Sequence, residues 1–206
     1  MKTLLILTGP QGSGNHVWSK IFALHPRVYG WQALLDQYWI GHDQEPFAGC
    51  WRDPDLLTQF DWSSHNYYVT SISNPYMYHG TATVPDVVLF AACAMGAGLK
   101  VKIGILGRDH NIVRLQENRV RGRITVDNAV EDYKKLRTFD PVFFSYELLQ
   151  LYKSEYLLQL SKQLDFPIDY SSSQVNQILN EDSNQKYVHP VDSHWVDNLA
   201  RKTSKI

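Results

Sequence analysis

The chain of 206 residues is the size of one compact domain, since single domains commonly hold about 100–200 residues. Its 20 Lys and Arg residues balance 21 Asp and Glu residues, and the net charge of −1 gives no overall field to attract nucleic acid or an anionic membrane. The two cysteines, Cys50 and Cys93, have neither zinc-site nor disulfide-framework spacing. We predict one cytoplasmic domain over residues 1–206 without a nucleic-acid partner, with an irregular aromatic-rich insertion at 31–65 and a C-terminal extension at 171–206.

The first element is a short apolar run, Thr3–Thr8, followed by the turn residues Gly9 and Pro10. A continuous apolar run of this length is typical of a strand that is buried on both faces of a parallel sheet. Its core, Leu4–Leu7, is too short for the hydrophobic part of a signal peptide. No apolar stretch of the sequence approaches the roughly 20 residues that span a bilayer. We expect a buried strand here and no membrane span.

Strands and helices alternate along the rest of the sequence. We expect strands at Tyr67–Ser73, Val101–Leu106 and Val142–Tyr146, and helices at Asn15–Leu24, Pro85–Gly98, after Asp109, Asn128–Leu136, Glu147–Leu164 and 174–180. Residues 32–62 show only a short helical pattern near Gln32–Trp39, and residues 74–85 are predicted to form a loop. The alternation predicts a three-layer α/β fold, in which a mostly parallel sheet has helices on both faces and ligands bind beyond the carboxyl ends of the strands.

The stretch TGPQGSGNH joins the first predicted strand to the first predicted helix. Gly9, Gly12 and Gly14 allow a tight turn whose backbone N–H groups can approach an anion at the positive end of the helix. A nucleoside-triphosphate loop would continue with Lys and then Ser or Thr, whereas this chain has Asn15 and His16. The loop predicts phosphate binding without the residues that handle the terminal phosphates and magnesium. An ordinary strand-to-helix turn is the alternative.

A second candidate for anion binding follows the third long strand. Arg108 comes directly after that strand, at the same sheet edge as the glycine loop if the strands are parallel, and its guanidinium suits a bidentate phosphate contact. Gln116, Arg119 and Arg123 follow at intervals of about one helical turn. A solvated basic face is the alternative for this helix, because charge runs usually face water.

Three stretches, in this order across most of the chain, resemble the P-loop sulfotransferases, which transfer a sulfuryl group from 3′-phosphoadenosine 5′-phosphosulfate (PAPS). LTGPQGSGNHVWSKIFALHPRV is similar to the family's 5′-phosphosulfate loop, and ILGRDHNIVRLQENRVR is similar to its 3′-phosphate segment. FFSYELLQLYKSEYLLQLSKQLDFP resembles its late strand with Tyr-Glu and the leucine-rich helix that follows. The resemblance implies a nucleotide-binding fold of the P-loop type, PAPS as the cofactor and no required metal.

The resemblance also assigns roles to individual residues. It implies that the cofactor is bound by Gln11, Gly12, Ser13, Gly14, Asn15, His16, Arg108 and Gln116. Ser13, Gly14 and Arg108 match the family's pattern, whereas Asn15 and His16 stand where the family usually has hydroxyl residues. Gln11 or Gly12 replaces the family's basic residue at the bridging oxygen, and Gln116 replaces a serine. Ser73 stands where many members carry the catalytic base.

Sulfuryl transfer needs a base near the acceptor and positive charge at the leaving phosphate. His16, in the first turn of the first helix, is one candidate catalytic residue, and His79, in the loop after the second long strand, is the other. A capping or core histidine is the alternative for His16, and a surface histidine is the alternative for His79. Asp109, His42 and His65 could also reach the strand ends, and the sequence does not choose among them.

The function that these features predict is transfer of a sulfuryl group from PAPS to a hydroxyl or amine of a small-molecule or glycan acceptor. Aromatic residues crowd the part of the sequence between residues 30 and 80, where they could stack on a sugar or flat acceptor, although core packing is the alternative. Two other functions stay open. A divergent P-loop nucleotide kinase or NTPase would need magnesium and another lysine, and a nucleotide-binding module would keep the anion site without turnover.

Overall fold

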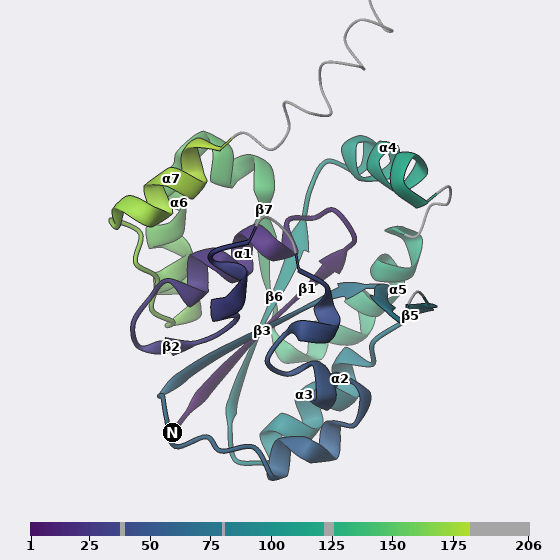
Figure 1. The fold of residues 1–206 in the computed structure, drawn as a ribbon, viewed down its shortest axis with the longest axis vertical. Helices are drawn as coiled ribbons and strands as arrows, with labels where there is room; N and C mark the ends of the chain where they lie inside the picture. Colours follow the sequence, from purple (N-terminus) through teal and green to yellow (C-terminus); the bar gives the residue numbers. More distant parts are fainter. Residues whose placement is uncertain (38–39, 80, 122–125, 182–206) are drawn as a thin grey trace, which may run out of the picture.

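The computed structural model of the chain describes residues 1–37, 40–79, 81–121 and 126–181, which form a central sheet with surrounding helices (Figure 1). Five strands lie side by side in the order β2, β3, β1, β6, β7, and every pairing between them is parallel. They are β2 (Val28–Tyr29), β3 (Tyr67–Asn74), β1 (Thr3–Pro10), β6 (Lys100–Gly107) and β7 (Val142–Ser145). The predicted parallel α/β fold is confirmed.

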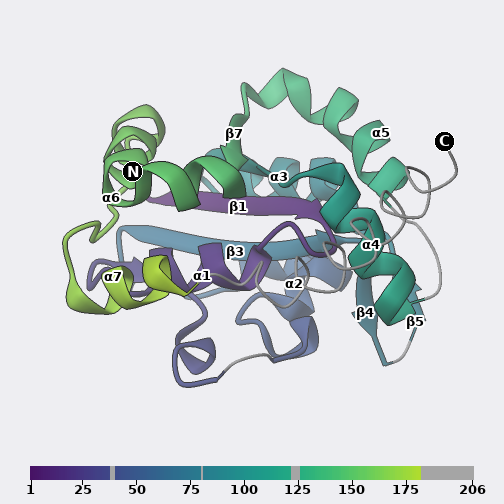
Figure 2. The same ribbon diagram turned by 90° about the horizontal axis from the view of Figure 1, so that it is seen from above.

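Helices cover both faces of this sheet, as Figure 1 and Figure 2 show together. The α-helices of the described ranges are α1 (Asn15–Ala23), α2 (Ala48–Arg52), α3 (Val87–Gly96), α4 (His110–Arg121), α5 (Val126–Leu136), α6 (Tyr146–Leu164) and α7 (Ser173–Asn180). Short 3-10 helices are η1 (Gln32–Leu34), η2 (His42–Gln44), η3 (Pro54–Thr58) and η4 (Arg137–Phe139). None of the helices in the described ranges is long and apolar enough to cross a membrane.

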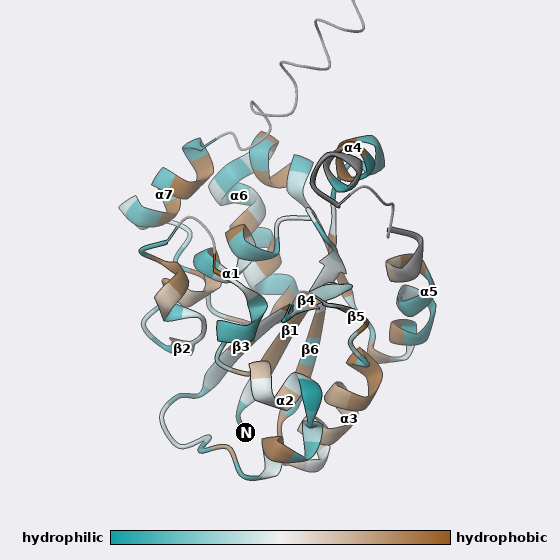
Figure 3. Ribbon diagram, turned by 45° about the vertical axis from the view of Figure 1, so that its right-hand side comes forward, coloured by the Kyte–Doolittle hydropathy of each residue, from teal (hydrophilic) through white to brown (hydrophobic). Residues whose placement is uncertain are grey.

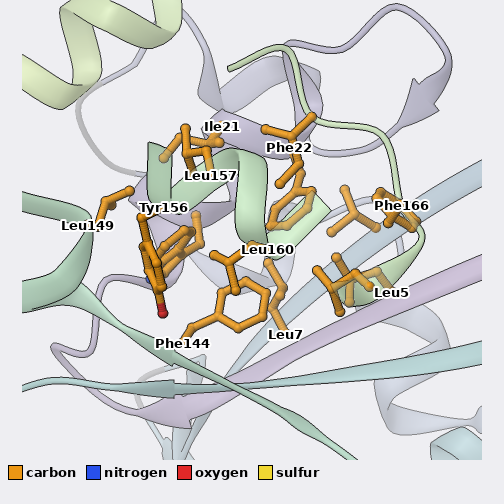
Figure 4. Close-up of a cluster of buried hydrophobic side chains, with 14 of the residues drawn as sticks. Leu5, Leu7, Ile21, Phe22, Phe144, Leu149, Tyr156, Leu157, Leu160 and Phe166 are labelled. Atoms are coloured by element: carbon orange, nitrogen blue, oxygen red, sulfur yellow. The ribbon is translucent and has the colours of Figure 1, made fainter. Parts of the chain in front are cut away.

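The central strand β1 is buried along its whole length, and its side chains alternate between two hydrophobic clusters. Leu5 and Leu7 pack against residues of α1, α6 and α7 on one face of the sheet (Figure 4). Leu4 and Ile6 pack against residues of α2, α3 and α5 on the other. Figure 3 shows the hydrophobic colouring of β1 and β6 between helices that have both hydrophobic and hydrophilic sides. A strand that is apolar on both faces needs this three-layer arrangement.

The carboxyl ends of β3, β1 and β6 meet at one edge of the sheet. Gly9 pairs with Ser73 across β1 and β3, and Thr8 pairs with Ile105 across β1 and β6. From β1 the chain continues to β2 and β3 on one side, and β6 and β7 lie on the other side. Ligands of open parallel sheets bind at such a reversal of strand order.

The segment between β2 and β3 contains 3-10 helices and the short α2, as its irregular sequence predicts. β2 pairs only with Tyr67 and Tyr68 at the start of β3. Beyond these two residues, the outer edge of β3 is in contact with the segment that joins β2 to β3. The carboxyl group of Glu45 accepts hydrogen bonds from the N–H of Phe47 at 2.7 Å and from that of Ser71 at 3.4 Å. A buried side chain thus satisfies a strand N–H that would otherwise lack a partner.

The structure differs from the sequence prediction in several elements, the short β2 among them. Residues predicted as a loop after β3 contain a hairpin of β4 (Tyr76–Tyr78) and β5 (Thr81–Thr83), which pair antiparallel. Strands of three residues are too short to produce a recognisable alternation. In addition, α6 begins at Tyr146, which the sequence places in the preceding strand, and Lys153 inside it has a non-helical φ of 46°.

Candidate functional site

The glycine loop leaves β1 in a tight turn. The Ser13 N–H donates to the Pro10 carbonyl at 3.1 Å, and Gly12 at the turn has a φ of 91°. A Cβ at Gly9 would lie 2.5 Å from the Leu106 carbonyl oxygen, so β1 and β6 meet this closely only with glycine at that position. The loop is therefore held by backbone geometry and has its predicted place between a buried strand and a helix.

The start of α1 has the features of an anion-binding helix terminus. Gly14 caps the helix with a φ of 98° and without a side-chain hydrogen bond, and no acidic residue stands in the first turn. The N–H groups of a first helical turn have no partner within the helix, and they carry the positive end of its dipole. An anion at this end of α1 would contact backbone N–H donors, and no carboxylate in the first turn would repel it.

The side chain of Arg108 lies on the glycine loop. Its Nη1 donates to the Gly12 carbonyl at 2.8 Å, and its guanidinium carbon lies 4.6 Å from the centre of the Tyr146 ring. Only 7% of Arg108 is exposed. The Tyr146 ring also supports the loop, because a Cβ at Gly14 would lie 3.1 Å from its Cδ2. The two regions that the sequence predicts as anion sites are thus adjacent, and one buried aromatic ring lies against both.

Asn15 faces the neighbouring strand β3. Its Nδ2 lies 3.1 Å from Ser73 Oγ and 3.4 Å from Ser13 Oγ, and its Oδ1 accepts a hydrogen bond from Ser71 Oγ at 3.1 Å. Ser71 and Ser73 are two residues apart, so they point to the same face of the sheet. A lysine in the place of Asn15 would carry its charge to a phosphate, whereas this amide cross-links the loop, α1 and β3 through buried hydrogen bonds.

His16 and His42 form a ring cluster with Trp31 beside the start of α1. The centroids of the two imidazoles lie 5.3 Å apart, and each ring lies within 5.6 Å of the Trp31 ring. His16 Nε2 lies 2.7 Å from the Ile40 carbonyl oxygen, which can only accept, so Nε2 carries the hydrogen. Burial lowers the pKa of His16. His16 is therefore neutral at pH 7, and its Nε2 is engaged by the backbone.

His42 also contacts β3. Its Nε2 lies 3.5 Å from Ser73 Oγ. Burial, and after it the neighbouring His16, lowers the pKa of His42 to about 3. The imidazole is half-buried and stays neutral near pH 7.

Glu45, three residues after His42, is the buried carboxyl group of this region. Burial raises its pKa to about 8, even though Thr70 and the N–H groups of Phe47 and Ser71 hydrogen-bond to it. The carboxyl group is thus largely protonated at pH 7, which is consistent with its place in the hydrophobic interior.

The other predicted site residues either take no part in these contacts or lie outside the described residues. His79 is exposed in the turn between β4 and β5 with a φ of 45°, and its ring lies 4.2 Å from that of Tyr78. Gln11 is buried, and within the described chain its Oε1 has no hydrogen-bond partner.

The backbone of Gln116 is helical, but its side chain and that of Arg119 lie outside the described residues, as does Arg123. Among the described residues, no group of three His, Cys, Asp or Glu side chains could hold a metal ion.

The sequence prediction missed the contributions of Tyr146 and Ser71 and did not single out His42. Two signals were present. Ser71 and Ser73 alternate on one strand directly before its end, and Tyr146 follows the last strand directly. His42 gave no such signal, because its position depends on how the irregular segment after β2 crosses the edge of the sheet.

No protein-family model matches this sequence, and no curated protein matches it with significant similarity. At one sheet edge lie a helix start without a side-chain cap, a guanidinium and a neutral imidazole next to a serine hydroxyl. The first two suit a ligand with negative charge, and the last pair could accept a proton.

Proposed function

We propose that the chain binds PAPS at the carboxyl ends of β1 and β6 and transfers its sulfuryl group to a hydroxyl or amine of a small-molecule or glycan acceptor. The observation that carries the proposal is the contact of 2.8 Å between Arg108 Nη1 and the Gly12 carbonyl. It brings the two segments that resemble the 5′-phosphosulfate and 3′-phosphate regions of P-loop sulfotransferases into direct contact. A nucleotide with anionic groups at both its 3′ and 5′ positions needs two such groups of donors close together.

The residues of the loop suit the 5′ end of this cofactor. Gly12 and Gly14 have no side chains that would obstruct an anion, and the first turn of α1, with Asn15 and His16, supplies N–H donors without a competing carboxylate. Arg108 supplies the cation for the 3′-phosphate. When bound, PAPS supplies the activated sulfuryl group. The protein orients that group, stabilises negative charge on the leaving phosphate and takes a proton from the acceptor.

A nucleotide-binding module without turnover is the second candidate. It is favoured by the contacts of the two residues that replace the usual hydroxyl residues. Asn15 hydrogen-bonds to Ser71 and Ser73, and His16 Nε2 hydrogen-bonds to the Ile40 carbonyl. With both side chains engaged by the protein, catalysis would depend on other groups of the site.

Calorimetric titration tests the binding proposal. We expect 3′-phosphoadenosine 5′-phosphate (PAP) to bind more tightly than ATP, with the same affinity in magnesium and in EDTA. The reason is that the site has a cation and backbone donors but lacks the lysine of a nucleoside-triphosphate loop. Tight ATP binding that requires magnesium would instead indicate the kinase or NTPase class.

Variants of Arg108 separate its charge from its shape. Arg108→Ala should lose PAP binding, and Arg108→Lys should lose most of it, because lysine keeps the charge but lacks the planar fork. Arg27→Ala, at an exposed position after α1, is the matched control and should bind as the wild type does. Melting temperatures must show that the Arg108 variants are folded. Unchanged PAP affinity in folded Arg108→Ala would refute the role of this residue in binding.

A further inference from the structure

We propose that Ser73 and His42 form a proton-accepting pair, in which the Ser73 hydroxyl takes the proton of the acceptor group and passes its own to His42 Nε2. The inference rests on the proposed transfer function and names the base for it. The pair stands at the carboxyl end of β3, next to the end of β1, since Gly9 and Ser73 are paired residues. His42 comes from η2, far from the loop in sequence.

The hydrogen bonds around Ser73 leave one lone pair of its hydroxyl unused. A serine hydroxyl donates one hydrogen bond and accepts two. Ser73 Oγ accepts from Asn15 Nδ2 at 3.1 Å, which leaves its own hydrogen for His42 Nε2, 3.5 Å away. The second lone pair of Ser73 is then the acceptor for a substrate O–H or N–H.

The direction of this chain follows from Asn15. Ser71 Oγ donates to Asn15 Oδ1, so the amide nitrogen faces Ser73 and Ser13. Ser73 therefore accepts from Asn15 and is left to donate to His42. The opposite orientation of the amide would make Ser73 donate to Asn15, and His42 Nε2 would then carry a hydrogen. The tautomer of His42 distinguishes the two arrangements.

The step balances in atoms and charge. The acceptor O–H bond breaks as its oxygen bonds to sulfur, and the bond from sulfur to the bridging oxygen breaks, with PAP as the leaving group. One proton moves to Ser73 Oγ while the Ser73 proton moves to His42 Nε2, which yields an imidazolium. His42 is neutral beforehand, and the negative charge of a bound sulfuryl donor favours its protonated form. The Ser73–His42 distance of 3.5 Å is long for a hydrogen bond, and catalytic contacts shorten when substrate binds.

The tautomer of His42 is measured by NMR of protein labelled with 15N-histidine, with the His42 signals assigned by their loss in His42→Gln. We expect the Nδ1–H tautomer, with Nε2 unprotonated, and a displaced Nε2 signal in Ser73→Ala. This readout does not depend on turnover. An Nε2–H tautomer, or an Nε2 signal that Ser73→Ala leaves in place, overturns the proposal.

Hydrolysis of PAPS, in which water is the acceptor, measures how much the Ser73–His42 pair accelerates sulfuryl transfer. We expect PAP release to fall by about tenfold or more in His42→Gln and in Ser73→Ala, since a positioned base contributes on the order of 10²–10⁴-fold. PAP affinity should stay within about threefold of wild type, because the proposed anion site is formed by Gly12, Gly14 and Arg108 and not by the side chains of Ser73 and His42. His25→Gln, at the far end of α1, is the control and should hydrolyse PAPS at the wild-type rate.

The outcomes separate this proposal from the proposed function. A wild-type protein that does not bind PAP overturns both. PAP binding with an unchanged hydrolysis rate in His42→Gln overturns the pair alone. PAP binding without detectable PAPS hydrolysis in the wild type also overturns the pair, and it favours the binding module without turnover.

Discussion

The guanidinium carbon of Arg108 lies over the ring of Tyr146 beside the glycine loop, 4.6 Å from the ring centre. Tyr146 is the first residue of α6, and it is almost fully buried. An aromatic face attracts a cation and also fixes its position, because the ring itself is packed. Tyr146 at the start of α6 contacts Arg108, which follows β6, and Arg108 in turn hydrogen-bonds to Gly12 in the loop after β1.

Replacing Tyr146 should reveal this support. We expect Tyr146→Leu to lower the free energy of unfolding by about 1–3 kcal/mol, since it removes a buried ring and its contact with Arg108. Tyr146→Phe keeps the ring and loses the hydrogen bond from Gln150, which should cost about 1 kcal/mol or less. Denaturant unfolding measures both. Equal losses in the two variants would show that the hydroxyl, and not the ring, is the important part.

Gly9→Ala should be strongly destabilising. The added Cβ would lie 2.5 Å from the Leu106 carbonyl oxygen and 2.6 Å from Ser13 Oγ, so β6 or the loop would have to move. Overpacking of this kind typically costs about 1–3 kcal/mol. Gly49→Ala, in α2, is the control: its Cβ would have only an ordinary contact of 3.8 Å with Leu56, and alanine is the better helix former. A tolerated Gly9→Ala would mean that β1 and β6 can separate at the site.

Glu45 should make the protein less stable as the pH rises. Its pKa is about 8 in the folded chain and near its ordinary value of 4.5 when unfolded, so between these values the folded state holds a proton that the unfolded state has lost. Stability contributed by this group falls over that window, with a slope of up to about 1.4 kcal/mol per pH unit. We expect Glu45→Gln to show a smaller loss of stability between pH 5 and 8 than wild type does.

His42 should act in the opposite direction. Its folded pKa of about 3 lies below its ordinary value of 6.5, so the unfolded chain takes up the proton first as the pH falls. The stability associated with neutral His42 is full above pH 6.5 and is lost progressively toward pH 3. Chemical denaturation at pH 6.5 and 4.5 should show a smaller acid loss in His42→Gln than in wild type. The same acid loss in both proteins would mean that His42 titrates normally.

Strong local patterns made most of the fold predictable from the sequence. β1 contains the continuous apolar run Leu4–Leu7, and β3 and β6 are rich in β-branched or aromatic residues. The helix starts at Asn15 and Ser173 follow recognisable turn or capping residues. β2, β4 and β5 have only two or three residues each, which is too few to show a period. The break of helical geometry at Lys153 has no glycine or proline to signal it.

The candidate site was predictable only in part. The rule that parallel strands end at one edge predicts that the glycine loop and Arg108 are neighbours, and they are in contact. That rule cannot show which side chains outside the strands reach this edge. His42 approaches Ser73 because η2 is attached to the outer side of β3, and this attachment depends on tertiary contacts of Glu45.

The short length of β2 has a consequence for the chemistry of the site. No strand in the described part of the chain covers Ser71 on its outer side. The stretch that brings Glu45 to the Ser71 N–H also brings His42, three residues before Glu45, to Ser73. One segment therefore both closes the flank of the sheet and positions the imidazole. We expect loss of the Glu45 hydrogen bond to displace the imidazole from the serine without any change at either of those two residues.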